Sequence, residues 1–83
     1  MDLEDIRLFL MISRAHTLTE AAKELQVPKS SASRSISRLE QELGIALLYR
    51  TNRKIVLTEA GERFAQYATE IVRQSREGRA ALD

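Results

Sequence analysis

The segment with the clearest chemical pattern is VPKSSASRSISRLEQEL, residues 27–43. Its apolar residues recur at steps of four and three, which places them on one stripe of a helix. That stripe consists of Ala32, Ile36, Leu39 and Leu43. The opposite face carries short hydroxyls, an amide and a cation, in Ser30, Ser33, Arg34, Ser37 and Gln41. Such a face can approach base edges and phosphates closely, whereas the alternative is a solvated helix face that happens to be rich in serine.

Positive charge gathers in the same part of the chain. The 83 residues together have a net charge of only +1. Residues 28–56, however, carry six lysines and arginines against two acids, while the segments on either side each carry more acids than bases. A cationic region on an otherwise neutral domain is typical of phosphate binding.

Catalysis, metal binding and membrane insertion find no support in the sequence. The chain has no cysteine, and His16, its only histidine, has no second ligand at usable spacing; we expect it at an exposed helix end. The serines lack a His/Asp arrangement, so we expect no enzyme activity, no cofactor and no metal. The longest apolar run, Leu8 to Ile12, is too short to span a membrane, which predicts a soluble, cytoplasmic protein.

Capping residues set the predicted helices. Asp2 begins a helix that runs to about His16, and the Thr17–Glu20 capping box begins a second one that runs to about Leu25. A tight turn at residues 26–27 leads to a third helix, residues 28–43, in which proline occupies the first turn. Gly44 is expected to end that helix in a left-handed conformation.

The second half of the chain predicts a β-hairpin and a long helix. Two short β-prone runs, residues 47–49 and 55–57, flank the polar turn 50–54, which gives a hairpin with a basic tip. Thr58 then caps a helix that continues to the chain end. This order predicts a mainly α winged helix-turn-helix, residues 1–58, with three helices and a two-stranded wing. A long linker helix, residues 59–83, follows.

The long helix also predicts self-association. One stripe holds apolar and small side chains: Phe64, Tyr67, Ala68, Ile71, Ser75, Gly78 and Leu82. Because so small a body cannot cover the whole stripe, we expect the part near Phe64 to pack on the body and residues 71–82 to face a second copy. The predicted dimerisation residues are Tyr67, Ile71, Ser75, Gly78 and Leu82. The helical pattern is still running where the sequence stops, which suggests a chain truncated before a further domain.

Several residue pairs are spaced as in one known family: Ala21-Ala22, Ser33-Arg34, Leu39-Glu40, Leu43-Gly44, Leu57-Thr58 and Ala60-Gly61. On these the chain resembles the N-terminal domain of LysR-type transcriptional regulators along essentially its whole length. The resemblance implies a bacterial repressor or activator that binds pseudo-palindromic DNA as a dimer or tetramer. It also implies antiparallel pairing of linker helices and a C-terminal sensing domain for a small-molecule inducer. At Lys29-Ser30 the chain departs from the family, so a base preference does not carry over.

The sequence predicts which residues of the third helix and its neighbour contact double-stranded DNA. Lys29, Ser30, Ser33 and Arg34 are the first-choice major-groove residues, with phosphate-only contact as the alternative. Ser37 shares their face. Arg38 is expected to bind phosphate, or else to pair with Glu42 within the helix. Thr19, in the preceding helix, is expected to donate to a phosphate.

In the wing, Arg53 and Lys54 are expected to enter the minor groove or to bind its phosphates, with Arg50 supporting them from the strand. A solvated turn is the alternative. A winged helix that docks a protein partner is the competing function, and it would show an apolar face on the third helix.

Overall fold

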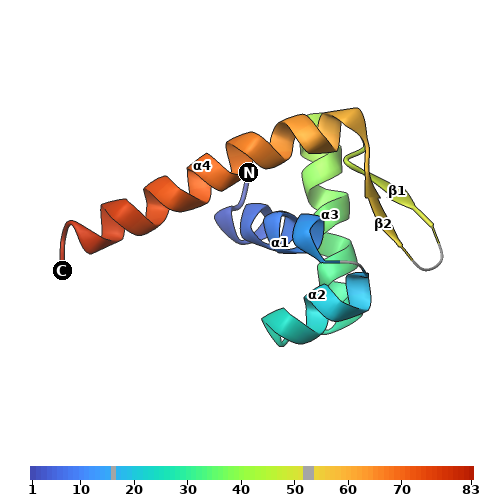
Figure 1. Cartoon of the computed structure of the whole chain (residues 1–83), viewed down its shortest axis with the longest axis horizontal. Helices are drawn as coiled ribbons and strands as arrows, with labels where there is room; N and C mark the ends of the chain where they lie inside the picture. Colours follow the sequence, from blue (N-terminus) through green and yellow to red (C-terminus); the bar gives the residue numbers. More distant parts are fainter. Residues whose placement is uncertain (16, 52–53) are drawn as a thin grey trace.

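The computed structural model describes residues 1–15, 17–51 and 54–83, which form four helices and one hairpin (Figure 1). The elements are α1 (Leu3–Arg14), α2 (Leu18–Leu25), α3 (Lys29–Leu43), β1 (Leu48–Arg50), β2 (Ile55–Leu57) and α4 (Glu59–Ala80). The three short helices pack together, the hairpin lies beside α3, and α4 crosses the body and extends past it. The predicted winged helix-turn-helix with a long last helix is confirmed.

Side-chain caps begin three of the helices, as their sequences predicted. In each, a side-chain oxygen accepts a hydrogen bond from a backbone N–H in the first turn, which satisfies a donor that the helix itself leaves unpaired. The pairs are Asp2 with Glu4 at 3.1 Å, Thr17 with Glu20 at 3.1 Å, and Thr58 with Gly61 at 2.9 Å.

The turns around α2 and α3 follow the local chemistry with small shifts of boundary. Gln26 ends α2 at a φ of 58°, and Gly44 ends α3 at a φ of 71°, so both adopt the left-handed conformation that reverses the chain. Pro28 has a ψ of 145° and therefore precedes α3 instead of forming its first turn. Helix α1 ends at Arg14, two residues earlier than predicted; His16 lies outside the described residues.

The core lies between α1, α3 and the first half of α4. Phe9, Ile12, Ile36 and Leu39 are among its fully buried side chains. Burying one such side chain stabilises the fold by about 1.5–3 kcal/mol. The predicted apolar stripe of α3 is confirmed, with Leu43 half-buried at its end. Since this stripe faces inward, the opposite face of α3 must face outward.

A carboxylate of α3 fixes the position of the wing. The Oε2 atom of Glu40 accepts hydrogen bonds from the backbone N–H groups of Leu47, at 2.7 Å, and Leu48, at 3.2 Å. Leu47 is buried and precedes β1, so the strand begins one residue later than predicted. The strands pair antiparallel, with Leu48 opposite Leu57 and Arg50 opposite Ile55.

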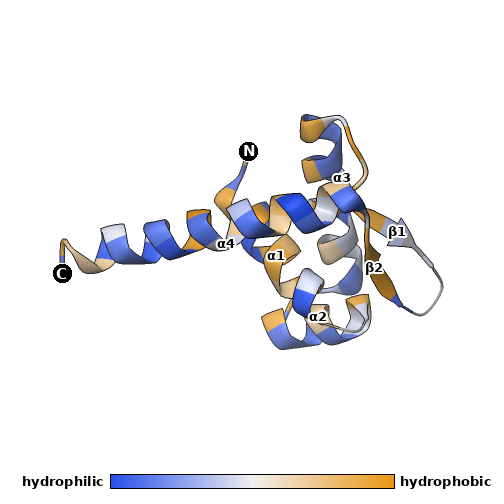
Figure 2. Cartoon of the chain, turned by 45° about the horizontal axis from the view of Figure 1, so that its top comes forward, coloured by the Kyte–Doolittle hydropathy of each residue, from blue (hydrophilic) through white to orange (hydrophobic). Residues whose placement is uncertain are grey.

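Helix α4 is joined to this segment at its first turn. Thr58 donates its hydroxyl to the carbonyl of Ala46, at 2.7 Å, and its N–H to the carbonyl of Leu47, at 3.0 Å. The ring of Phe64 lies 5.5 Å from that of Phe9, measured between centroids, which packs this half of α4 on α1. Every residue from 73 onward is exposed, and this end projects from the body with a mostly hydrophilic surface (Figure 2). None of the described helices is long and apolar enough to cross a membrane.

Candidate nucleic-acid interface

The exposed face of α3 carries the predicted DNA-contacting side chains. Lys29, Ser30, Arg34 and Ser37 are exposed, and Ser33 is half-buried at the edge of the same face. Among the described residues, no acid forms an ion pair with Lys29 or Arg34. The face is polar and cationic, which suits DNA and does not suit the apolar docking of a protein partner.

The wing lies beside this face. A groove between α3 and the hairpin brings Ser33 together with Lys54. Its lining residues are Leu18, Ser33, Ile36, Leu48, Tyr49, Thr51, Lys54 and Ile55. The hydroxyl of Thr51 closes the turn by donating to the carbonyl of Lys54, at 2.6 Å, and the Lys54 side chain is exposed. The structure thus places one predicted wing cation next to α3.

Two other predicted wing residues are described only in part or not at all. Arg50 is the last residue of β1, and its backbone pairs with Ile55. Arg53 lies outside the described residues. In α2, Thr19 is exposed, whereas the hydroxyl of Thr17 serves as the helix cap. Thr19 is therefore the threonine of the two with a hydroxyl that capping does not use.

Arg38 has a partner that the sequence analysis missed. Its Nε donates to Oδ2 of Asp5 at 3.1 Å, and its Nη2 donates to Oδ1 of Asp5 at 2.9 Å and to the hydroxyl of Ser35 at 3.1 Å. The Arg38 pair therefore joins α3 to α1. It takes the place of the pair with Glu42, which was the alternative to the phosphate contact expected of Arg38. No local spacing signals a contact between residues 33 positions apart.

The Asp5 carboxyl group is nearly inaccessible, because the residue is only 1% exposed. The hydrogen bonds from Arg38 lower the pKa of Asp5 below its ordinary value, against the opposing effect of burial. In return, the same hydrogen bonds raise the pKa of the Arg38 guanidinium. Both members of the pair are therefore ionised at neutral pH, where DNA binding would take place. The one signal for this pair in the sequence is that Asp5 is an acidic residue on the side of α1 that faces the body.

The predicted stripe of α4 divides between two surroundings. Ala68 is fully buried against the body, together with Val72, which the sequence analysis did not single out. Tyr67, Ile71 and Leu82, in contrast, are 70%, 37% and 90% exposed. The stripe is therefore not one continuous exposed face, because the helix turns its Ala68 side onto α1.

The two small residues of the predicted seam differ in their surroundings. Gly78 has open space where a Cβ would stand. Ser75 lies at the border between α4 and α1, where it lines a shallow groove with Leu3 and Arg7. Its hydroxyl donates to the carbonyl of Val72 at 3.1 Å.

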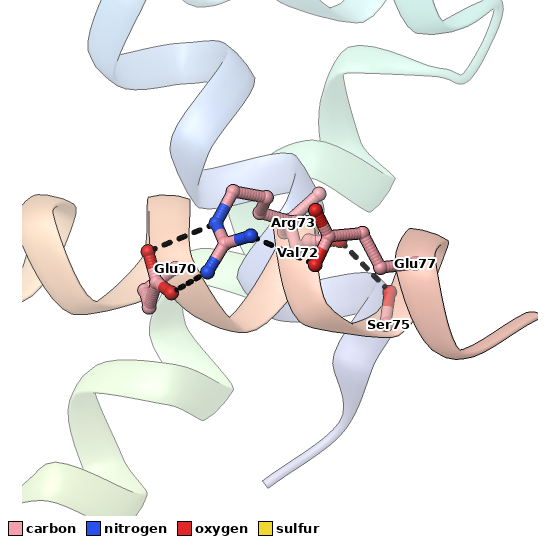
Figure 3. A network of polar contacts seen from close by, with 5 residues as sticks. All are labelled: Glu70, Val72, Arg73, Ser75 and Glu77. Atoms are coloured by element: carbon pink, nitrogen blue, oxygen red, sulfur yellow. Dashed lines mark hydrogen bonds and ion pairs between the residues drawn. The ribbon is translucent and has the colours of Figure 1, made fainter. Parts of the chain in front are cut away.

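The outer face of α4 holds an ion-pair network (Figure 3). Arg73 lies between Glu70 and Glu77, and it donates to Glu77 at 2.8 Å and from Nε to Glu70 at 3.2 Å. The hydrogen bond with Arg73 lowers the pKa of Glu70, and the hydrogen bond with Glu70 raises that of Arg73. Pairs at these spacings support an exposed helix. Within the described part of the chain, no group of three or more potential ligand side chains could hold a metal ion.

Comparison with known proteins assigns the family. Residues 3–62 match the model of the bacterial regulatory helix-turn-helix proteins of the lysR family. The chain is 38% identical over 81 residues to the iron-regulated virulence regulatory protein IrgB of Vibrio cholerae. It is 39% identical over 83 residues to the HTH-type transcriptional activator IlvY of Salmonella typhimurium. The alignments include 98% and 100% of this chain, but only 27% and 28% of the length of IrgB and IlvY, respectively.

Solved structures agree with this assignment. The BenM DBD in complex with benA site 1 DNA superposes with a TM-score of 0.92 at 33% identity, covering 99% of this chain and 95% of that one. The CbnR DBD in its complex with DNA superposes with a TM-score of 0.87 at 33% identity, covering all of both chains. The relatives by sequence are named as regulators or activators and not as enzymes. This chain belongs to the lysR family of bacterial regulatory helix-turn-helix proteins and comprises the family's DNA-binding domain.

Proposed function

We propose that the chain binds pseudo-palindromic operator DNA as a two-fold dimer in the bacterial cytoplasm, with α3 in the major groove and the wing beside the minor groove. The observation that carries the proposal is the division of α3 into a buried apolar stripe and an exposed face of serines and cations. The likeness to the BenM DBD and the CbnR DBD in their complexes with DNA, at TM-scores of 0.92 and 0.87, supports it further.

The dimensions of α3 suit this arrangement. Its 15 residues extend over about 22 Å, and a major groove about 12 Å wide admits a helix. Lys29, Ser30 and Arg34 lie in its N-terminal half, the part of a recognition helix that reaches base edges. Arg34 suits a guanine edge, while Ser33 suits either a base or a phosphate. Ser37 would extend the contact along the helix, and Thr19 would donate to a phosphate.

The wing would supply contacts that depend less on sequence. Lys54 is placed next to α3, and we assign it to the DNA backbone or the minor groove. The prediction for Arg53 and Arg50 is the same as before: Arg53 at the minor groove, and Arg50 supporting it from β1. The logarithm of the DNA affinity falls linearly with the logarithm of the salt concentration, and loss of one phosphate contact should make this slope less steep by about 0.9.

A substitution at Arg34 tests this mode of binding. We expect Arg34→Ala to weaken the binding free energy by roughly 1–3 kcal/mol on a DNA site selected from a random duplex pool. The loss on random duplex should be smaller, because only the selected site loses a base contact together with the charge. Arg63→Ala is the matched control, since this exposed arginine of α4 lies by Leu43 at the opposite end of α3. Affinities are measured by fluorescence anisotropy over a salt series. Equal losses on both DNAs would contradict base recognition by Arg34.

Dimerisation through α4 is supported by exposure and by charge. Tyr67, Ile71 and Leu82 are exposed, and Gly78 and Ser75 permit close helix approach. The first half of α4, residues 59–70, has three acids and one arginine, whereas residues 71–80 have three arginines and one acid. Antiparallel pairing of two copies would set the acidic half of each against the basic half of the other.

The dimer is tested by sedimentation of the whole chain. We expect a dimer at tens of micromolar and a folded monomer for Ile71→Asp, because the seam would bury an unpaired carboxylate. Gln66→Asp, which places the same group on an exposed position outside the stripe, should remain dimeric. A monomeric wild type, or a dimeric Ile71→Asp variant, would refute the proposed seam.

This chain spans about a quarter of the length of its relatives. An assembly larger than the dimer would therefore involve a longer protein. Tetramer formation, and an inducer site in a C-terminal sensing domain, remain predictions for the full-length protein. No cofactor is proposed for the DNA-binding domain.

A further inference from the structure

The contact between Asp5 and Arg38 joins the first helix to the recognition helix at a buried point. Both oxygens of the Asp5 carboxylate accept hydrogen bonds from one guanidinium, at 2.9 and 3.1 Å. Asp5 is 1% exposed, whereas 56% of the Arg38 side chain is accessible. One end of the pair is therefore inside the protein and the other is at its surface.

This geometry fixes the orientation of the guanidinium. A bidentate pair holds the planar group in one plane and one direction, which a single hydrogen bond does not do. The hydroxyl of Ser35 adds a third contact at Nη2, at 3.1 Å. Nε and Nη2 are thus occupied, and of the residues that the structure describes none accepts a hydrogen bond from Nη1.

Arg38 is placed where this remaining edge can be used. It lies one helical turn beyond Arg34 on α3, so the two side chains are neighbours along the helix. Ser37 and Arg34 beside it are exposed. A duplex that contacts the first half of α3 has its backbone passing the second half, where phosphate oxygens accept hydrogen bonds from arginine.

We propose that Asp5 is a positioning residue of the DNA interface: it holds Arg38 so that the Nη1 edge of the guanidinium binds a DNA phosphate. The inference rests on the proposed function, and it names a residue of α1 that need not touch DNA itself. Because the pair carries no net charge, the contact depends on the direction of the N–H groups and less on attraction between charges.

The opposite effect would follow if Asp5 only neutralised Arg38. Removing the carboxylate would then release a cation and strengthen binding to any DNA. The two roles therefore predict changes of opposite sign in the same variant, Asp5→Asn.

The experiment measures affinity for a selected duplex by anisotropy, at temperatures where circular dichroism shows each variant folded. Glu4→Gln is the matched control, because Glu4 lies in the same turn of α1, makes an exposed pair with Arg7 at 3.0 Å, and loses the same charge. We expect Asp5→Asn to bind about tenfold more weakly than Glu4→Gln, the effect of one charged hydrogen bond. Arg38→Gln should lose as much DNA affinity as Asp5→Asn. Because Asp5 acts through Arg38, the double variant should bind no more weakly than Arg38→Gln alone.

A second variant and a spectrum keep the test independent of stability. Arg38→Lys retains the charge but replaces the planar guanidinium with a rotatable ammonium group, which Asp5 cannot hold in one plane with a donor edge facing a phosphate, so it should bind about as weakly as Arg38→Gln. In nitrogen-15 spectra, the side-chain signal of Arg38 should shift when DNA is added. Tighter binding by Asp5→Asn, equal affinities of Asp5→Asn and Glu4→Gln, or full affinity of Arg38→Lys would overturn the inference. If wild type binds and Arg34→Ala loses discrimination, such a result leaves the proposed function standing; if wild type does not bind DNA, the proposed function itself fails.

Discussion

Replacing Gly61 with alanine should destabilise the domain, although alanine is the better helix former. A Cβ at Gly61 would stand 2.1 Å from the carbonyl oxygen of Leu47 and 3.0 Å from its carbonyl carbon, where ordinary contacts are about 3.5 Å. Because the obstacle is backbone, α4 must retreat by roughly 1 Å. That movement strains the two bonds from Thr58 to the carbonyls of Ala46 and Leu47.

The magnitude follows from these contacts. Overpacking costs about 1–3 kcal/mol and each weakened hydrogen bond about 1 kcal/mol, while alanine returns about 1 kcal/mol of helix propensity. We expect a net loss of about 2–4 kcal/mol in the free energy of unfolding. Urea denaturation followed by circular dichroism measures it.

Gly78 provides the matched control, since it lies in the same helix with open space around its position. Both glycine variants are compared in the Ile71→Asp background, which we expect to be monomeric, and there Gly78→Ala should be unchanged or up to about 1 kcal/mol more stable. A Gly61→Ala variant as stable as the Ile71→Asp parent would show that α4 is not held against the Leu47 carbonyl as described.

Two further substitutions test the ionic contacts of α3. Glu40→Ala should lower the free energy of unfolding by about 2 kcal/mol and speed amide exchange at Leu47 and Leu48, whose N–H groups it binds; unchanged exchange at both would contradict the anchor. Asp5→Asn should be less stable than wild type at neutral pH, because the Arg38 hydrogen bonds lower the pKa of Asp5 below 3.8 and so favour the folded, ionised state. That difference should shrink as pH falls below about 4 and the carboxylate takes up a proton, and a difference that stays constant down to pH 2 would contradict the assignment.

Much of the fold was predictable because its signals are local. Asp2, Thr17 and Thr58 cap helices through bonds that reach only two or three residues along the chain. Gly44 ends α3 in a left-handed conformation that glycine adopts at less cost than other residues. Periodicity then told which side of α3 is buried, and so which side is available to DNA.

The missed features are those that depend on tertiary packing. Asp5 meets Arg38 only because α1 lies across α3, and acids in a first helical turn, here Glu4 and Asp5, usually signal the helix dipole instead. The sequence analysis named Glu40 only as part of a residue pair spaced as in the family, and it did not predict that Glu40 binds the backbone at Leu47 and Leu48. The division of the α4 stripe into a part on the body and an exposed part was predicted, but the burial of Val72 was missed, since it depends on which residues α1 covers.

In the proposed complex, DNA lies against the exposed face of α3 and the wing. Titrating the nitrogen-15-labelled dimer with a selected duplex, and following each backbone amide by NMR, tests it most directly. We expect the largest shifts on residues 29–37 and on Thr51 and Lys54, with small changes at residues 73–80. Largest shifts along the second half of α4, with α3 unchanged, would contradict it.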